Sequence, residues 1–69
     1  MKISARNALK GRIRQITSGA VNSEVIIEIS GGERIVSIIT RQSVESLGLK
    51  EGMEVYAVIK ASNVMVAVD

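Results

Sequence analysis

Four residues near the start of the chain combine side chains that suit oxyanion binding. They are Ser4, Ala5, Arg6 and Asn7, which supply a hydroxyl, a guanidinium and an amide within one short segment. A tetrahedral or octahedral oxyanion requires charge-assisted donors of this kind, together with backbone N–H groups outside regular strands. Taken alone, the segment is also typical of an ordinary N-terminal arm in which Ser4 or Asn7 caps a turn.

Two further breaks between apolar stretches carry hydrogen-bond donors. The first offers a cation, two polar side chains and a small residue beside which an anion can approach the backbone: Lys60, Ala61, Ser62 and Asn63. The second has an uncovered backbone and one amide but no charge: Gly19, Ala20, Val21 and Asn22. Each break by itself is more typical of a plain surface turn than of a binding site.

Composition excludes several kinds of catalysis. The chain has no histidine and no cysteine, which removes Ser–His–Asp and Cys–His catalysis, disulfides and zinc-type sites. Its seven acidic residues stand singly along the sequence, so no local pattern pairs two carboxylates. We therefore expect a binding protein and not an enzyme, with no protein side chain acting as a direct metal ligand.

No segment has the pattern of a membrane span or a secretory signal. The longest apolar run covers residues 64–68, whereas a spanning helix needs about 20 apolar residues. Lys2 follows the first methionine, but no apolar stretch comes after it. A cytoplasmic protein is the default expectation.

Basic residues are concentrated at the N-terminus. Five of the nine lie in the first fourteen positions, and no acid precedes Glu24: Lys2, Arg6, Lys10, Arg12 and Arg14. Such a polarised chain predicts an end that attracts anions, for which a nucleic acid is the commonest partner. Tyr56 is the sole aromatic residue, so the chain has no platform on which bases could stack. A small anion suits this composition better, while a nucleic-acid-binding module and a solvated basic face without ligand remain the alternatives.

Alternation of apolar and polar residues predicts five strands and one short helix. We expect strands over residues 9–17, 21–30, 33–40, 53–60 and 64–68. Thr40 can cap a helix and Gly48 can end it, so a helix of about two turns should lie between the third and fourth strands. This order is typical of an all-β, five-stranded OB-like barrel. The length allows a single domain over residues 1–69.

The isolated chain is expected to be marginally stable. A domain of this length buries too little surface to gain much over its conformational entropy. Several apolar residues also fall on faces that should be polar: Ile26, Val36 or Ile39, Val58, and one face of residues 64–68. We interpret these residues as an interface between identical chains. The alternative is that a β-bulge shifts the alternation by one residue.

The donor-rich breaks belong to a longer ordered set of sequence blocks. In order they are Ser4-Ala5-Arg6-Asn7, Leu9-Lys10-Gly11, Gly19-Ala20-Val21-Asn22-Ser23-Glu24-Val25, Ser43-Val44 with Leu47-Gly48-Leu49, Glu51-Gly52 and Lys60-Ala61-Ser62-Asn63-Val64. Each block is common, but the ordered set resembles the molbindins, the stand-alone proteins of the molybdate-binding Mop domain family. The resemblance covers nearly the whole chain. No DNA-binding or ATPase domain is attached, which points to the stand-alone form.

The resemblance implies an OB-like barrel assembled as a homohexamer, which is a trimer of dimers. It also implies that molybdate or tungstate binds at the subunit interfaces, for intracellular molybdenum storage and homeostasis. By position, one class of site would contain Ser4, Ala5, Arg6 and Asn7 of one chain facing Lys60, Ala61 and Ser62 of a neighbour. A second class, near a symmetry axis, would be lined by Gly19, Ala20, Val21 and Asn22. Two positions depart from the family pattern: Asn63, where serine is frequent, and Gln42, where aspartate is frequent.

Overall fold

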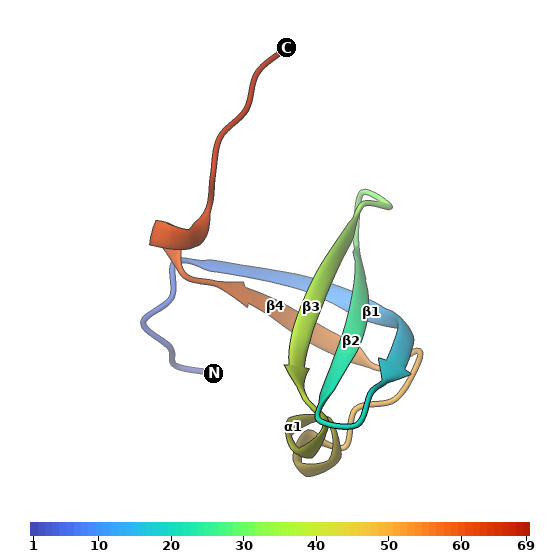
Figure 1. Cartoon of the computed structure of the whole chain (residues 1–69). Coiled ribbons are helices and arrows are strands. Elements are labelled where there is room, and N and C mark those ends of the chain that lie inside the picture. The colour runs from blue at the N-terminus through green and yellow to red at the C-terminus, as the bar shows by residue number, and fades with distance from the viewer.

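The computed structural model describes all residues, 1–69, and consists of one curled antiparallel sheet with a short helix at one end (Figure 1). The strands are β1 (Asn7–Ser18), β2 (Asn22–Ile29), β3 (Arg34–Thr40) and β4 (Glu54–Ile59). They lie in the order β3-β2-β1-β4. The helix α1 (Arg41–Leu47) follows β3, and a 3-10 turn, η1 (Ala61–Asn63), follows β4. The strong twist gives the sheet the form of a half-barrel, consistent with an all-β OB-like fold.

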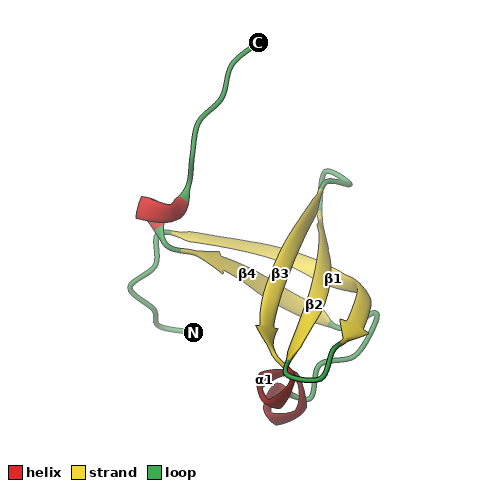
Figure 2. Cartoon of the chain, in the orientation of Figure 1, coloured by secondary structure: helices red, strands yellow, loops and turns green.

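The predicted fifth strand is wrong for the single chain. Residues 64–68 pair with no other strand, and the sheet has four strands instead of five (Figure 2). The alternation of this segment has the β pattern, but a strand also requires a neighbouring edge with which to form hydrogen bonds. After η1 the chain runs away from the sheet, so the segment does not lie alongside β3 or β4.

The core lies on the concave side of the half-barrel and is small. Its buried apolar residues come from the three adjacent strands β1, β2 and β4: Ile13, Val25, Ile27 and Ala57. Six partly buried apolar residues pack around them: Ile16, Ile35, Ile39, Val44, Leu49 and Val55. Only four hydrophobic residues of the 69 are fully buried, which agrees with the expectation of a marginal single chain.

A β-bulge in β1 departs from the predicted strict alternation. Ile13 pairs with Ile27 and Gln15 pairs with Ile26, so Arg14 is the extra residue. Ile13 and Ile16 are three positions apart and would lie on opposite faces of a regular strand. Because the bulge inserts one residue between them, both side chains pack on the core.

The helix begins and ends at the predicted residues. Thr40 Oγ1 accepts a hydrogen bond from the Ser43 N–H at 3.0 Å, and Gly48 takes the left-handed conformation with φ 64°. Val44 on this helix packs against the core, whereas Leu47 stays 63% exposed. No helix in the structure is long and apolar enough to cross a membrane.

Several apolar side chains are exposed on the single chain, as the sequence predicts. Val36 is 60% exposed and Val58 is 48% exposed, whereas Ile39 packs against the core and Ile26 is partly buried. The bulge in β1 leaves the alternation of β2, β3 and β4 unchanged. A bulge that shifts the alternation by one residue therefore does not explain why these side chains are exposed.

Candidate oxyanion-binding site

The antiparallel pairing of β1 with β4 brings two of the three donor-rich segments to one end of the sheet. Asn7, the first residue of β1, lies opposite Ile59, the last residue of β4. Asn7 also donates a hydrogen bond from Nδ2 to the Ile59 carbonyl oxygen at 3.3 Å. Residues 4–6 enter the sheet where residues 60–62 leave it (Figure 1). One chain thus places the two segments next to each other, whereas the resemblance implies a neighbouring chain for the second.

The turn after β4 leaves backbone donors free. Within η1, the Asn63 N–H donates to the Lys60 carbonyl oxygen at 2.9 Å, and the Val64 N–H donates to the Ala61 carbonyl oxygen at 3.2 Å. The N–H groups of Ala61 and Ser62 precede these donors and lie outside the hydrogen bonds of the turn. Lys60, Ala61 and Ser62 are all exposed, so backbone and side-chain donors are accessible together.

The distribution of ion pairs separates two groups of basic side chains. Five of the nine basic residues pair with a carboxylate: Lys10, Arg12, Arg14, Arg34 and Arg41. The four that have no carboxylate within 4.0 Å are Lys2, Arg6, Lys50 and Lys60. Arg6 directly precedes β1 and Lys60 directly follows β4, at the end of the sheet where the donor segments meet. Two cations without a carboxylate partner therefore lie at that end.

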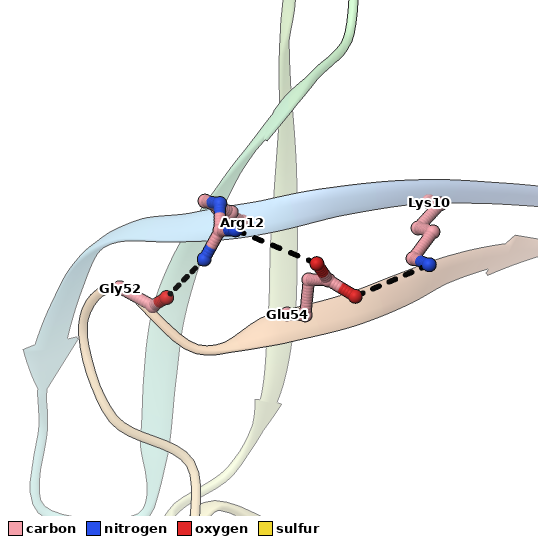
Figure 3. A network of polar contacts seen from close by, with 4 residues as sticks. All are labelled: Lys10, Arg12, Gly52 and Glu54. Carbon is pink, nitrogen blue, oxygen red and sulfur yellow. Dashed lines mark hydrogen bonds and ion pairs between the residues drawn. The ribbon is translucent and has the colours of Figure 1, made fainter.

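Two cations on β1, Lys10 and Arg12, are paired with a residue of the neighbouring strand β4 (Figure 3). Glu54 on β4 accepts both Lys10 Nζ at 3.2 Å and Arg12 Nη2 at 3.4 Å, and Arg12 Nη1 donates to the Gly52 carbonyl oxygen at 3.0 Å. The hydrogen bond and the charge of Glu54, with a smaller contribution from Tyr56, raise the pKa of Lys10 above its ordinary value of 10.5. Two cations share one carboxylate here, so the network lowers the local positive charge without cancelling it.

The third donor-rich segment lies at the opposite end of β1. Gly19, Ala20, Val21 and Asn22 connect β1 to β2, and all four are exposed. The Gly19 N–H donates to the Asn22 carbonyl oxygen at 2.8 Å, and a Cβ at position 19 would lie 2.6 Å from that same oxygen. Glycine is therefore required for this tight loop. Along the twelve residues of β1, at about 3.3 Å per residue, the loop is about 36 Å of strand away from Asn7.

The structure adds one cation beside this loop that the sequence pattern does not reveal. The Arg41 N–H donates to the Val21 carbonyl oxygen at 2.8 Å, so the start of α1 lies directly against the loop. Arg41 Nε also pairs with Glu45 Oε1 at 3.5 Å. Because Asn22 pairs with Thr40 across β2 and β3, only the strand register, and no local motif, could have indicated this neighbour.

Comparison with known protein families identifies the chain. The TOBE domain model matches residues 3–66, almost the whole sequence. The chain belongs to the TOBE domain family. Similar proteins include molybdenum-pterin-binding protein 3 of Clostridium pasteurianum, 52% identical over 66 residues that cover 96% of this chain and 97% of the relative. A probable molybdenum-pterin-binding protein of Haemophilus influenzae is 49% identical over 69 residues, the full length of both chains.

Solved structures agree with this TOBE domain assignment. The chain superposes on MopII from Clostridium pasteurianum with a TM-score of 0.92 at 51% identity, covering 97% of this chain and all of the other. It also superposes on a molybdate-bound form of the cytoplasmic molybdate-binding protein ModG with a TM-score of 0.90 at 49% identity. That match covers 94% of this chain and 46% of ModG. The resemblance to the Mop family drawn from the ordered sequence blocks is confirmed.

Proposed function

We propose that this chain is a single molybdate-binding domain over residues 1–69 that captures molybdate, and also tungstate, between identical subunits. The observation that carries the proposal is that two cations without a carboxylate partner, Arg6 and Lys60, adjoin the paired ends of β1 and β4. The names of the relatives refer to molybdenum-pterin or molybdate, which supports molybdate as the anion. The role is binding and not catalysis, and it serves molybdenum storage and homeostasis in the cytoplasm, where ModG is described.

In the first class of site, Arg6 and Lys60 supply positive charge, and Ser4, Asn7 and Ser62 supply side-chain donors. Ala5 and Ala61 are small, so they leave the adjacent backbone N–H groups open to an anion. A dianion at this position neutralises cations that have no carboxylate partner within the chain. The second class of site consists of Gly19, Ala20, Val21 and Asn22, where copies of the loop converge in a homo-oligomer, which we propose to be a hexamer built as a trimer of dimers.

Charged side chains and exposed donors also suit polyanions, so the competing function is a nucleic-acid-binding module. Two observations weigh against it. Lys10, Arg12 and Arg14, which would extend a basic track along β1, are each paired with Glu54 or Glu28. The sole aromatic residue, Tyr56, leaves no platform for stacked bases. A filter-binding assay with a salt titration separates the two functions, since phosphate contacts give steeply salt-dependent binding.

Native mass spectrometry with and without molybdate, with sulfate as the control anion, tests the proposed function. We expect an oligomer that gains several molybdate masses and none from sulfate. The double substitution Arg6→Ala, Lys60→Ala should remove one class of bound molybdate and retain the other. Lys50→Ala is the matched control, because Lys50 is also an exposed, unpaired lysine but follows α1. A monomer that gains no molybdate would contradict the proposal.

A further inference from the structure

The loop between β1 and β2 has no positive charge of its own. Gly19, Ala20, Val21 and Asn22 are uncharged, and the nearest charged residue along β2 is an acid, Glu24. Backbone N–H groups and an amide bind a dianion less strongly than donors that also carry positive charge. A dianion held at this loop, as in the second class of proposed site, therefore requires a cation from another element.

Arg41 is the cation whose backbone is tied to this loop. Its N–H donates to the Val21 carbonyl oxygen at 2.8 Å, and the preceding residue, Thr40, pairs with Asn22 across β2 and β3. These contacts hold the first residue of α1 against the loop, and both lie at the same end of the sheet (Figure 1). Because an arginine side chain is long and flexible, the guanidinium of Arg41 can reach an anion bound at the loop.

In the single chain the Arg41 side chain is held by one exposed ion pair. Its Nε lies 3.5 Å from Oε1 of Glu45, one turn further along α1. The side chains are 56% and 68% exposed, respectively, and exposed pairs at this helical spacing contribute little free energy. An anion at the loop thus competes with a single solvated carboxylate for this guanidinium.

We infer that Arg41 supplies the positive charge of the second class of site, and that Glu45 lowers the affinity of this site by holding Arg41 when no anion is bound. The inference rests on the proposed function, because it places molybdate at the loop. A guanidinium presents several N–H donors in one plane, which suits two oxygens of one anion. Where copies of the loop converge, each copy brings its own Arg41, and an anion between them relieves the repulsion of like charges.

Substitutions that remove the charge of each partner test this assignment. They are made in the chain with Arg6→Ala and Lys60→Ala, in which the second class of site remains, and molybdate binding is measured by equilibrium dialysis at low salt. Arg41→Gln should weaken binding roughly tenfold, because a hydrogen bond to a charged group is lost. Glu45→Gln should strengthen binding about twofold, because the competing carboxylate is removed. The same two substitutions in the parent chain, with bound molybdate counted by native mass spectrometry, give a second reading.

The controls separate anion binding from a structural role. Arg34→Gln is the matched control, since Arg34 is also an exposed arginine with a glutamate partner at 3.5 Å, but begins β3 at the end of that strand away from the loop. Breaking the Arg41–Glu45 pair affects the thermal midpoint without molybdate in the same direction from either side. Opposite shifts in molybdate affinity are therefore not explained by lost stability. Arg41→Lys keeps the charge and should restore part of the binding.

Opposite shifts in affinity, with Arg34→Gln unchanged, support the inference. An unchanged dissociation constant in Arg41→Gln, or shifts in the same direction for Arg41→Gln and Glu45→Gln, overturns it and leaves the proposed function intact. If the parent chain binds molybdate but the chain with Arg6→Ala and Lys60→Ala binds none, the second class of site is absent and this inference falls with it. A parent chain that binds no molybdate contradicts the proposed function itself, and the inference with it.

Discussion

Pairing with carboxylates divides the basic residues into those that stabilise the sheet and those that remain available to a ligand. Glu54 and Glu28 together engage Lys10, Arg12, Arg14 and Arg34, all at distances between 3.2 and 3.5 Å. Arg6 and Lys60 have no such partner. Because every paired side chain of β1 is more than half exposed, these pairs add little stability.

The Lys10–Glu54 pair predicts a pH dependence at the alkaline end. The pKa of Lys10 is raised in the folded chain, so the folded state holds this proton more tightly than the unfolded state does. The stabilisation is therefore complete below the ordinary pKa of 10.5 and is lost as the pH rises through the folded pKa. Lys10→Met should lower the thermal midpoint slightly at neutral pH, and its difference from the parent chain should vanish at strongly alkaline pH.

Thermal melts across pH 7 to 12 at low salt check this expectation, with Lys50→Met as the control because Lys50 has no carboxylate partner. Added salt should shrink the Lys10 effect as well, since the pair is exposed. A difference between Lys10→Met and the parent that persists unchanged above pH 11 would show that the side chain acts through packing and not through its charge.

Gly11 lies where the backbones of β1 and β2 approach each other closely. A Cβ at this position would lie 2.5 Å from the Glu28 carbonyl oxygen and 2.8 Å from Ile27 Cγ2. Gly11→Ala should therefore destabilise the chain by about 1–3 kcal/mol, the usual cost of overpacking. Gly31→Ala is the matched control, because its Cβ would meet only the end of the Glu33 side chain, at 3.0 Å, and no backbone atom. Equal denaturation midpoints for the two variants would contradict this account of the β1–β2 contact.

At the scale of the elements, the helix depends on its cap. Thr40 Oγ1 accepts from the Ser43 N–H at 3.0 Å and lies 2.7 Å from Ser43 Oγ. Thr40→Ala should cost about 1 kcal/mol, as loss of an N-cap usually does. Thr40→Ser keeps the hydroxyl and should retain most of the stability in chemical denaturation. If both variants lose the same amount, the methyl group and not the cap is what stabilises this corner.

The same cap also fixes the candidate loop of the second site. Thr40 pairs with Asn22, and the next residue, Arg41, donates its N–H to the Val21 carbonyl oxygen. The start of α1 thus positions the backbone of the loop between β1 and β2. This contact gives the short helix a structural role in an otherwise all-β chain.

The elements also show what the sequence can and cannot predict. Four strands and the helix are local patterns, and each was predicted within about two residues of its observed bounds. The bulge at Arg14 could have been inferred from Ile13 and Ile16, whose odd spacing is incompatible with a regular strand that buries both. The fifth strand was wrong because alternation describes the segment alone, while pairing depends on where the neighbouring edge lies.

The candidate site was predictable only in part for a similar reason. The donor types in residues 4–7 and 60–62 are visible in the sequence, and the β1–β4 register then joins them. The pairing of Lys10 and Arg12 depends on Glu54, more than forty residues later in the chain, and no local pattern reveals that contact. Charge counted along the sequence therefore does not show which cations are paired, and the pairing in three dimensions distinguishes Lys10 and Arg12 from Arg6 and Lys60.

At the scale of the whole molecule, the small core and the large exposed apolar surface lead us to expect that association between chains would stabilise the fold. Four buried hydrophobic residues are few for a chain of 69. For an assembly in which association and folding are linked, the thermal midpoint rises with protein concentration. Anions bound between subunits would raise it further, because they bind only the assembled form. The assembly and the ligand thus act on the same equilibrium.

Measuring the thermal midpoint at increasing molybdate concentrations tests association and anion binding in one experiment. The midpoint should climb in proportion to the logarithm of the molybdate concentration, with about 2.7 kcal/mol of stabilisation per site when molybdate reaches one hundred times its dissociation constant. Arg6→Ala with Lys60→Ala should reduce the slope but not abolish it, since the loop of residues 19–22 lies about 36 Å of strand away. Sulfate at equal ionic strength controls for general salt effects. A midpoint that stays flat with molybdate would argue against interfacial anion sites, while a slope that disappears entirely in the double variant would leave no role for the second loop.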